Sequence, residues 1–218
     1  MKYKNKIIQV SCDGGAATGK STGAKMVSRK YKLAFLSSGL LYRYASYLIL
    51  KHKPKNKVSF LKSKFKNLNY KKINKINLHT QKISEYSAFI AKLNEVRKIL
   101  KKFQIDFSKK NKNCCIEGRD ISTKILPDSD VKFFFKCNLT KAAYRRYKEL
   151  KKSDTKIKLL DVKKALKMRN ISDTMRKNSP LLRHRDSVEI DTGKLDKAAV
   201  LAKMSKYIER KIKNKYGD

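Results

Sequence analysis

Residues 14–21, with the sequence GGAATGKS, match the phosphate-loop pattern G-x-x-x-x-G-K-[ST] at every position. A short β-branched run at 7–10 precedes them, and apolar residues with a helical period follow over 24–31. This order of strand, loop and helix is the context in which the motif binds phosphate. It predicts a concave loop whose backbone N–H groups face phosphate oxygens at the positive end of a helix.

Two side chains of this loop have predicted roles of their own. Lys20 is expected to reach the outer phosphates, and the Ser21 hydroxyl is expected to bind Mg²⁺. A glycine-rich turn with an incidental lysine is the alternative, and the flanking strand and helix favour nucleotide binding. The residues with a predicted role in ATP binding are Gly14, Gly15, Ala16, Ala17, Thr18, Gly19, Lys20, Ser21 and Thr22.

Short apolar runs alternate with helical periods along the rest of the chain. The alternation predicts an α/β fold with a parallel sheet wrapped by helices and with ligands at the carboxyl ends of the strands. Residues 51–78 are rich in lysine and asparagine and show little periodicity, which predicts a surface insertion of marginal order. Strands are predicted at 7–10, 33–37, 114–116, 131–135 and 188–191, and helices at 40–50, 80–102, 140–151 and 195–212. The apolar side of the helix at 80–102 would consist of Ile83, Phe89, Ile90, Leu93 and Val96.

The charge balance is extreme, because 56 basic residues face 18 acidic ones and give a formal net charge of +38. Such a balance suggests a nucleic acid or an anionic membrane as partner. Only 11 of the basic residues are arginines, and the 45 lysines are spread through the chain. Dispersed lysine is more typical of a solvated surface, so no obligate nucleic-acid partner is expected.

The cysteines and the N-terminal residues indicate a compartment. Cys12, Cys114, Cys115 and Cys137 lack the spacing of a metal site and are expected to be small core residues in a reducing environment. No signal-like segment precedes the first strand, and no run approaches 18 apolar residues. The expectation is a cytoplasmic monomer that acts on small molecules without a membrane.

A helix start at 38–43 combines hydroxyls, a glycine and an arginine. Ser38, the N-terminal amides and the Arg43 fork suit a second phosphate group. On the alternative interpretation Ser38 is an N-cap and Tyr42 belongs to the core.

Gly118-Arg119-Asp120 follows an apolar strand, where a parallel sheet presents its ligand-binding edge. The arginine can hold a phosphate, and the carboxylate can bind a base amino group, a hydroxyl or hydrated Mg²⁺. An Asx-turn would explain Asp120 but would leave Arg119 without a role.

Arg169, Asp173 and Arg176 stand at i, i+4 and i+7, so on a helix they share one face. A salt-bridged surface is the usual meaning of that spacing. Two arginines around one aspartate can also hold a sugar hydroxyl and neutralise a transferring phosphoryl group. Arg145-Arg146, followed by the polar stretch 151–158, indicate a mobile lid.

Taken in order, these segments resemble the bacterial cytidylate kinase family, a branch of the nucleoside monophosphate kinases. A phosphate loop alone is shared by many families, whereas the whole series spans most of the chain and is specific. The matching segments are 13–22, 38–43, 96–97, 118–120, 143–146 and 169–181.

The resemblance implies ATP- and Mg²⁺-dependent phosphorylation of CMP or dCMP by a single P-loop kinase domain. The implied parts are a core (1–43, 108–148 and 187–218), a monophosphate-binding region (44–107) and a lid (149–186). The implied catalytic residues are Lys20, Arg119, Asp120, Arg169 and Arg176. The implied substrate contacts are Ser38, Tyr42, Arg43, Arg97, Arg119, Asp120, Arg169, Asp173 and Arg176.

Several positions depart from the family pattern. Ala88, next to Ser87, stands where a serine helps to read cytosine, so the choice among CMP, dCMP and UMP stays open. Glu117 replaces an aspartate, Asn170 replaces an aspartate beside Arg169, and His79 stands where an arginine is common. Ser122-Thr123 replaces a Gly-Thr pair, and the insertion at 51–78 is shorter and richer in lysine than is usual.

Two alternatives differ from this interpretation. Another P-loop kinase for a small acceptor would keep Lys20, Ser21 and the lid arginines but would lack a base-reading set near Arg97 and Asp120. A basic RNA-binding NTPase would use the positive charge and would show a steep salt dependence of RNA affinity.

Overall fold

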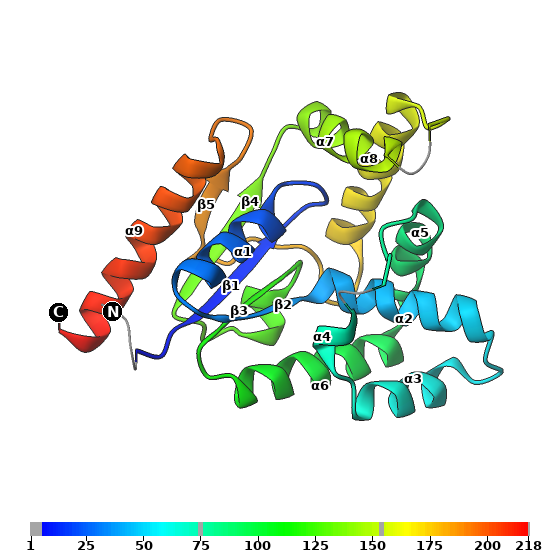
Figure 1. Cartoon of the computed structure of the whole chain (residues 1–218), viewed down its shortest axis with the longest axis horizontal. Coiled ribbons are helices and arrows are strands. Elements are labelled where there is room, and N and C mark those ends of the chain that lie inside the picture. Colours follow the sequence, from blue (N-terminus) through cyan, green and yellow to red (C-terminus); the bar gives the residue numbers. More distant parts are fainter. Residues whose placement is uncertain (1–5, 74–75, 153–154, 218) are drawn as a thin grey trace.

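The computed structural model describes residues 6–73, 76–152 and 155–217. Residues 1–5 and 218 of the predicted core, 74–75 of the predicted insertion and 153–154 of the predicted lid lie outside the described residues. The described chain forms a parallel five-stranded sheet in the order β2-β3-β1-β4-β5, covered by helices on both faces (Figure 1). The α/β fold predicted from the sequence is therefore confirmed. The strands are β1 (Gln9–Gly14), β2 (Ala34–Ser37), β3 (Cys114–Gly118), β4 (Val131–Lys136) and β5 (Val188–Asp191).

The helices surround this sheet, and a short π-helical turn, η1, follows β3. The predicted helices at 40–50, 140–151 and 195–212 are confirmed with small shifts of their ends. Within the described ranges, no helix combines the length and the apolar character that a bilayer crossing requires. The helical elements are α1 (Lys20–Lys30), α2 (Ser38–His52), α3 (Lys57–Lys66), α4 (Tyr70–Ile73), α5 (Gln81–Ile90), α6 (Asn94–Lys110), η1 (Ile121–Ile125), α7 (Leu139–Lys151), α8 (Leu159–Met175) and α9 (Lys197–Tyr216).

Strand β3 shows how the core is divided between the two faces of the sheet. Cys114 and Ile116 pack with α2, α3 and α6, whereas Cys115 packs with α1 and α9. Successive side chains of a strand point to opposite faces, so a strand covered on both sides reads as a continuous apolar run. A third cluster joins Ala16 of the loop to α7 and α8.

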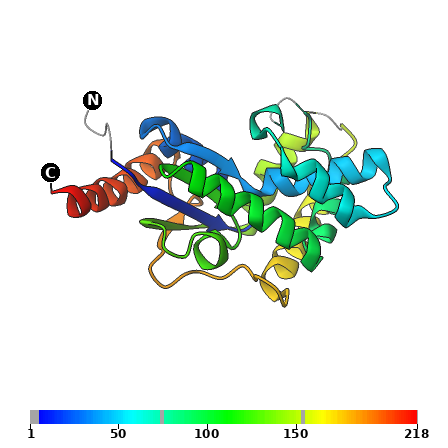
Figure 2. The same cartoon turned by 90° about the horizontal axis from the view of Figure 1, so that it is seen from below.

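Different helices and strands lie at the two ends of the molecule. α9 and the start of β1 lie at one end, while α2 and α3 lie at the other (Figure 2). At the first end the Ile7 N–H donates a hydrogen bond to Tyr216 Oη at 2.9 Å. This bond fastens the chain before β1 to the last helix.

The segment 51–78 is not the insertion of marginal order that its composition predicts. α3 and α4 form within it, and Leu61, Phe65 and Ile73 are buried against the helices around α2 and α6. The lysines of α3 are exposed and leave only two buried apolar residues on one side of that helix. So few apolar positions produce a weak period in the sequence, although they suffice to pack the helix.

The prediction of one continuous helix over 80–102 is also wrong, because α5 and α6 are separated at 91–93. Phe89 and Leu93, expected on the buried side, are 52% and 37% exposed. Arg97 Nη1 donates to the Ala91 carbonyl oxygen at 3.2 Å, so a side chain satisfies a carbonyl at the break. The other apolar residues of this period are buried: Ile83, Ile90 and Val96.

We expect Leu61→Ala to lower the free energy of unfolding by about 2–3 kcal/mol, because it removes a fully buried side chain from the interface of α3 and α6. Urea unfolding followed by circular dichroism measures this loss. Lys62→Ala, at an exposed position of the same helix, is the matched control and should leave the stability unchanged. Equal stability of both variants would contradict the packing of α3.

Candidate active site

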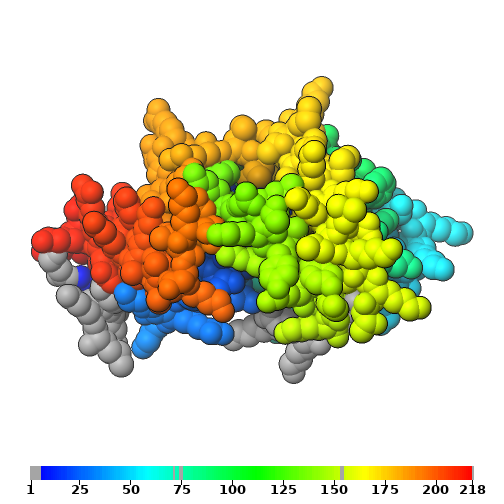
Figure 3. Space-filling model, turned by 90° about the horizontal axis from the view of Figure 1, so that it is seen from above, coloured from blue at the N-terminus to red at the C-terminus, as the bar shows by residue number. Residues whose placement is uncertain are grey.

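The phosphate loop joins β1 to α1 and lines a cavity of about 820 Å³ at the carboxyl edge of the sheet. In the space-filling view the blue segment that includes α1 is recessed between the orange and green surfaces (Figure 3). The cavity is rich in cations, which suits a ligand with several phosphates. The lysines and arginines of its lining are Lys20, Lys25, Arg43, Arg119, Arg145, Arg146, Lys148, Arg169 and Lys197. The carboxylates of its lining are Glu117, Glu149 and Asp196.

Two glycines of the loop are required by the backbone itself. An ideal Cβ on Gly14 would lie 2.4 Å from the Phe135 carbonyl oxygen, so this glycine permits β1 to pass close to β4. Gly19 adopts φ 82° directly before α1, a left-handed conformation that favours glycine. The first glycine of the motif is thus explained by strand packing, and its role in ATP binding stays a prediction.

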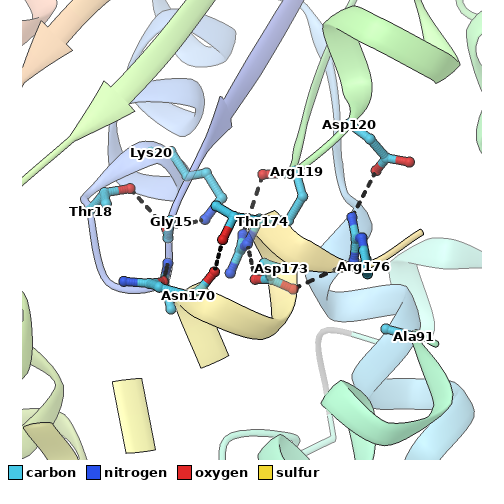
Figure 4. Close-up of polar contacts among 12 residues, drawn as sticks. Gly15, Thr18, Lys20, Ala91, Arg119, Asp120, Asn170, Asp173, Thr174 and Arg176 are labelled. Atoms are coloured by element: carbon cyan, nitrogen blue, oxygen red, sulfur yellow. Dashed lines mark hydrogen bonds and ion pairs between the residues drawn. The ribbon is translucent and has the colours of Figure 1, made fainter. Parts of the chain in front are cut away.

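Lys20 is 6% exposed and turns toward its own loop. Its Nζ donates to the Gly15 carbonyl oxygen at 3.0 Å and lies 3.8 Å from Glu117 Oε2. Thr18 Oγ1 donates to the same carbonyl at 3.0 Å (Figure 4). Burial, together with the nearby charge of Arg119, lowers the pKa of Lys20 to about 7. An anion entering the cavity would stabilise the protonated form of this lysine.

In the sequence Glu117 is only a departure from the family pattern, and the structure places it beside Lys20. It is 2% exposed at the carboxyl end of β3 and accepts a hydrogen bond from Ser37 Oγ. The signal in the sequence was a single acidic residue at the end of an apolar strand.

The described residues contain no group of three or more His, Cys, Asp or Glu side chains that could hold a metal ion. Among the residues that line the cavity, the Ser21 hydroxyl and the Glu117 carboxylate are two oxygen groups that could contact a metal ion. Mg²⁺ commonly takes one or two protein oxygens and completes its shell with substrate phosphates and water. The donor set therefore fits Mg²⁺ that arrives with a nucleotide.

Arg119 connects β3 to the predicted lid. Its Nε donates to Asp173 Oδ2 at 2.8 Å, and Arg176 Nη1 lies 3.5 Å from Asp173 Oδ1. α8 ends at Met175, so the expectation that Arg176 continues the same helix is wrong. Arg176 itself has extended backbone angles, φ −65° and ψ 137°, and its side chain still reaches Asp173.

Arg97, Asp120 and Tyr42 form a second group. Arg97 Nη2 lies 2.5 Å from Asp120 Oδ2, and the Arg97 guanidinium lies over the Tyr42 ring at 5.8 Å. Arg176 Nη2 approaches Asp120 Oδ1 at 4.0 Å and joins this group to the lid. Burial raises the pKa of Tyr42 to about 12, so its hydroxyl stays protonated and can donate a hydrogen bond.

The N-cap of α2 is Ser37, whose Oγ accepts a hydrogen bond from the Leu40 N–H at 3.2 Å. The interpretation of Ser38 as the cap is therefore wrong. Ser38 is 4% exposed, and its Cβ would lie 3.1 Å from a Cβ on Gly118. It lies against the strand end that carries Arg119.

Arg43 and Arg146 meet at one hydroxyl. Arg43 Nη1 donates to Ser84 Oγ at 2.7 Å, and Arg146 Nη2 lies 3.2 Å from the same oxygen and 3.1 Å from the His79 carbonyl oxygen. Burial and the charge of Arg169 lower the pKa of Arg43 to about 9. The two guanidinium groups share one neutral hydrogen-bond acceptor, so an anion could bind both of them.

Arg169 has a buried Nε without a hydrogen-bond partner among the described residues. Burial and the charge of Arg119 lower the pKa of Arg169 to about 10. Figure 4 shows Arg119 and Asp173 between the loop with Lys20 on one side and Asp120 with Arg176 on the other. The predicted residues thus come together in two groups with arginines between them.

Ser87 does not take the place of the serine that Ala88 lacks. It is 2% exposed, and its hydroxyl donates to the Ser84 carbonyl oxygen at 2.7 Å within α5. The departure at Ala88 is therefore a real difference at this site.

Known proteins resemble this chain over most of its length. The family model described as cytidylate kinase matches residues 10–210. A cytidylate kinase of Bartonella tribocorum is 32% identical and covers 95% of this chain and 97% of that protein. One of Mesomycoplasma hyopneumoniae is 31% identical and covers 95% of this chain and 96% of that protein. An uncharacterized protein of Eubacterium ventriosum has a crystal structure with a TM-score of 0.55 at 14% identity, over 94% of this chain and 99% of that one, and shares the fold.

The matching region contains the phosphate loop, the arginines that line the cavity and the lid residues around Asp173. It also covers all five strands except the first residue of β1. The chain belongs to the cytidylate kinase family.

Proposed function

We propose that the protein transfers the γ-phosphoryl group of Mg-ATP to CMP or dCMP. Membership of the cytidylate kinase family supports this acceptor. The observation that carries the proposal is one cationic cavity lined by the phosphate loop, Arg119 and Arg169. Arg119 lies between the loop and Asp120, which pairs with Arg97 (Figure 4). Such an arrangement can hold a donor at one end and an acceptor at the other.

At the donor end, the loop N–H groups and the N-terminus of α1 bind the ATP phosphates. Lys20 leaves the Gly15 carbonyl oxygen and contacts the outer phosphates. Ser21 would hold Mg²⁺, which when bound neutralises charge on the phosphate oxygens.

At the acceptor end, Arg43 binds the monophosphate, and its Ser84 contact gives way to phosphate oxygens. Arg97 presents a hydrogen-bond donor to the edge of the base, and Asp120 presents a hydrogen-bond acceptor. Tyr42 lies beside them. Ser38, at the strand end, lies near the acceptor phosphate. The acceptor is thereby fixed at both its phosphate and its base.

Phosphoryl transfer requires positioning and neutralisation of charge more than covalent chemistry. Positive charge around the transferring group comes from Arg119, Arg169 and Arg176. Asp173 holds Arg119 and Arg176 in place. Closure of the lid over the cavity excludes water, which would otherwise hydrolyse ATP.

The proposal includes the three parts expected from the sequence: the core, the monophosphate-binding region at 44–107 and the lid at 149–186. A monomer is the proposed active form. Its small-molecule substrates support a cytoplasmic location.

The test is ADP formation by the purified protein with Mg-ATP and a panel of CMP, dCMP, UMP, AMP, GMP and dTMP, at low and at high salt. We expect stimulation by CMP and dCMP alone. ATP hydrolysis that rises with added RNA and with none of the monophosphates would contradict the proposal and favour an RNA-dependent NTPase.

We expect Arg43→Ala to raise the KM for CMP about 10- to 100-fold, since it removes a charged hydrogen bond to phosphate, and to change the KM for ATP less than about twofold. Steady-state kinetics with each substrate varied in turn measure the two constants. Arg185→Ala, whose side chain is 91% exposed, is the matched control and should change neither constant. A change confined to the KM for ATP would reverse the placement of donor and acceptor.

A further inference from the structure

One contact between the lid helix and the phosphate loop has no role in the proposed function. The Ala16 N–H donates a hydrogen bond to Asn170 Oδ1 at 3.1 Å. The same oxygen lies 3.1 Å from the position that a Cβ on Gly15 would occupy. Figure 4 shows the Asn170 side chain, on α8, directed at the loop beside Gly15.

Asn170 Oδ1 offers the Ala16 N–H the kind of hydrogen-bond acceptor that a phosphate oxygen would also offer. It is a partially negative acceptor bound to a loop N–H of the kind that binds phosphate in such motifs. The amide side chain is neutral, so it satisfies the donor without introducing a charge beside the cations of the cavity.

Two side chains of the loop are also paired within the protein. Lys20 Nζ and Thr18 Oγ1 both donate to the Gly15 carbonyl oxygen. A phosphate that binds the Ala16 N–H must therefore replace Asn170, and one that binds Lys20 must attract it away from Gly15. The first exchange involves a residue of α8, which also carries Arg169 and Asp173.

We propose that Asn170 is a positioning residue that competes with the phosphates of ATP for the Ala16 N–H and so couples α8 to the occupancy of the loop. This inference rests on the proposed assignment of the loop to ATP. In the empty protein Asn170 keeps the Ala16 N–H oriented for an anion, and its side chain leaves that N–H when ATP binds. α8 is docked on the loop by this bond only while the nucleotide is absent.

The competition has a measurable size. The bond between Asn170 and the Ala16 N–H opposes ATP binding by about 1 kcal/mol, the net worth of one neutral hydrogen bond. Asn170→Ala removes this bond and should lower the Kd for ATP about fivefold. Asn170→Asp keeps the shape and adds a negative charge, which binds the N–H more strongly and repels phosphate. Its Kd for ATP should rise about fivefold or more.

The experiment measures ATP binding without an acceptor by titration calorimetry and the hydrogen exchange of the Ala16 amide by NMR. In the nucleotide-free wild type this amide should be protected, and in Asn170→Ala it should exchange at least about tenfold faster. Asn178→Ala is the matched control, because Asn178 donates to Asn94 Oδ1 at 2.6 Å and ties the same lid to α6 instead of to the loop. It should leave both the Kd and the Ala16 exchange unchanged.

Suppose that the wild type binds ATP in a manner that depends on Lys20. Weaker or unchanged ATP binding by Asn170→Ala would then overturn the inference. An equal effect of Asn178→Ala would also overturn it, since any lid tether would then act alike. Failure of the wild type to bind ATP would overturn the proposed function and this inference together. The order of affinities Ala, Asn, Asp at position 170, from tight to weak, supports it.

Discussion

Lys20→Ala is expected to lower kcat for phosphoryl transfer to CMP by about 10³-fold or more, because it removes the cation that contacts the phosphates during transfer. Lys20 lines the cavity and is only 6% exposed, so solvent cations cannot replace it effectively. Steady-state ADP formation at saturating Mg-ATP and CMP measures the effect. Lys203→Ala, at an exposed position of α9, is the control and should retain full activity. A Lys20→Ala variant with most of its activity would remove the loop from the mechanism.

The same lysine predicts a pH dependence of ATP binding. Burial lowers the pKa of Lys20 to about 7, so an increasing fraction of the empty protein holds it neutral above that pH. Phosphates bind the protonated form, and ATP binding must then take up a proton. The Kd for ATP should therefore rise as pH increases from about 7 to 9, by up to about tenfold per pH unit. Lys20→Arg, which stays protonated, should remove this dependence.

Asp13→Ala is expected to lower the free energy of unfolding by about 4 kcal/mol, the largest stability effect that we predict. Asp13 is fully buried at the end of β1 and accepts hydrogen bonds from the Ile121 N–H, the Ser122 N–H and Ser122 Oγ at 2.8, 2.7 and 2.6 Å. Alanine would leave these donors buried without a partner. Urea unfolding at pH 7 measures the loss, and Ser11→Ala, which removes one side-chain bond on the same strand, should cost only about 1 kcal/mol.

The pH dependence of stability gives a second test of Asp13. Burial raises its pKa from 3.8 to about 6, so between these values the folded protein keeps a proton that the unfolded chain has lost. The contribution of Asp13 to stability is therefore largest below pH 4 and falls as the pH rises to 6. Asp13→Ala should lack this fall, and a fall of the same size in the variant would assign it to other groups.

The fold and the donor end of the site could be predicted because their signals are local. A phosphate loop needs its glycines, lysine and hydroxyl within eight residues, and buried strands such as β4 are continuous apolar runs. The spacing predicts Asp173 between Arg169 and Arg176, and the structure pairs it with Arg176 and with Arg119 in place of Arg169.

The rest depends on contacts between distant segments. Asn170 and Ala16 are 154 residues apart, and no pattern in the sequence reports their bond. The position of Glu117 beside Lys20 follows from the neighbouring places of β1 and β3 in the sheet. The helix α3 escapes prediction because its exposed lysines conceal a period of only two buried residues. The apolar period also runs across the break before α6, where Arg97 binds the Ala91 carbonyl oxygen.

The junction of Arg43 and Arg146 at Ser84 has a consequence for the lifetime of the protein. Repulsion between these cations, and from Arg169 nearby, opposes folding when the cavity holds no anion. A substrate at 100 times its Kd adds about 2.7 kcal/mol to the stability of the folded form, which lowers the population of unfolded chains open to proteolysis. The abundance of the folded enzyme is thereby tied to the supply of the nucleotides on which it acts.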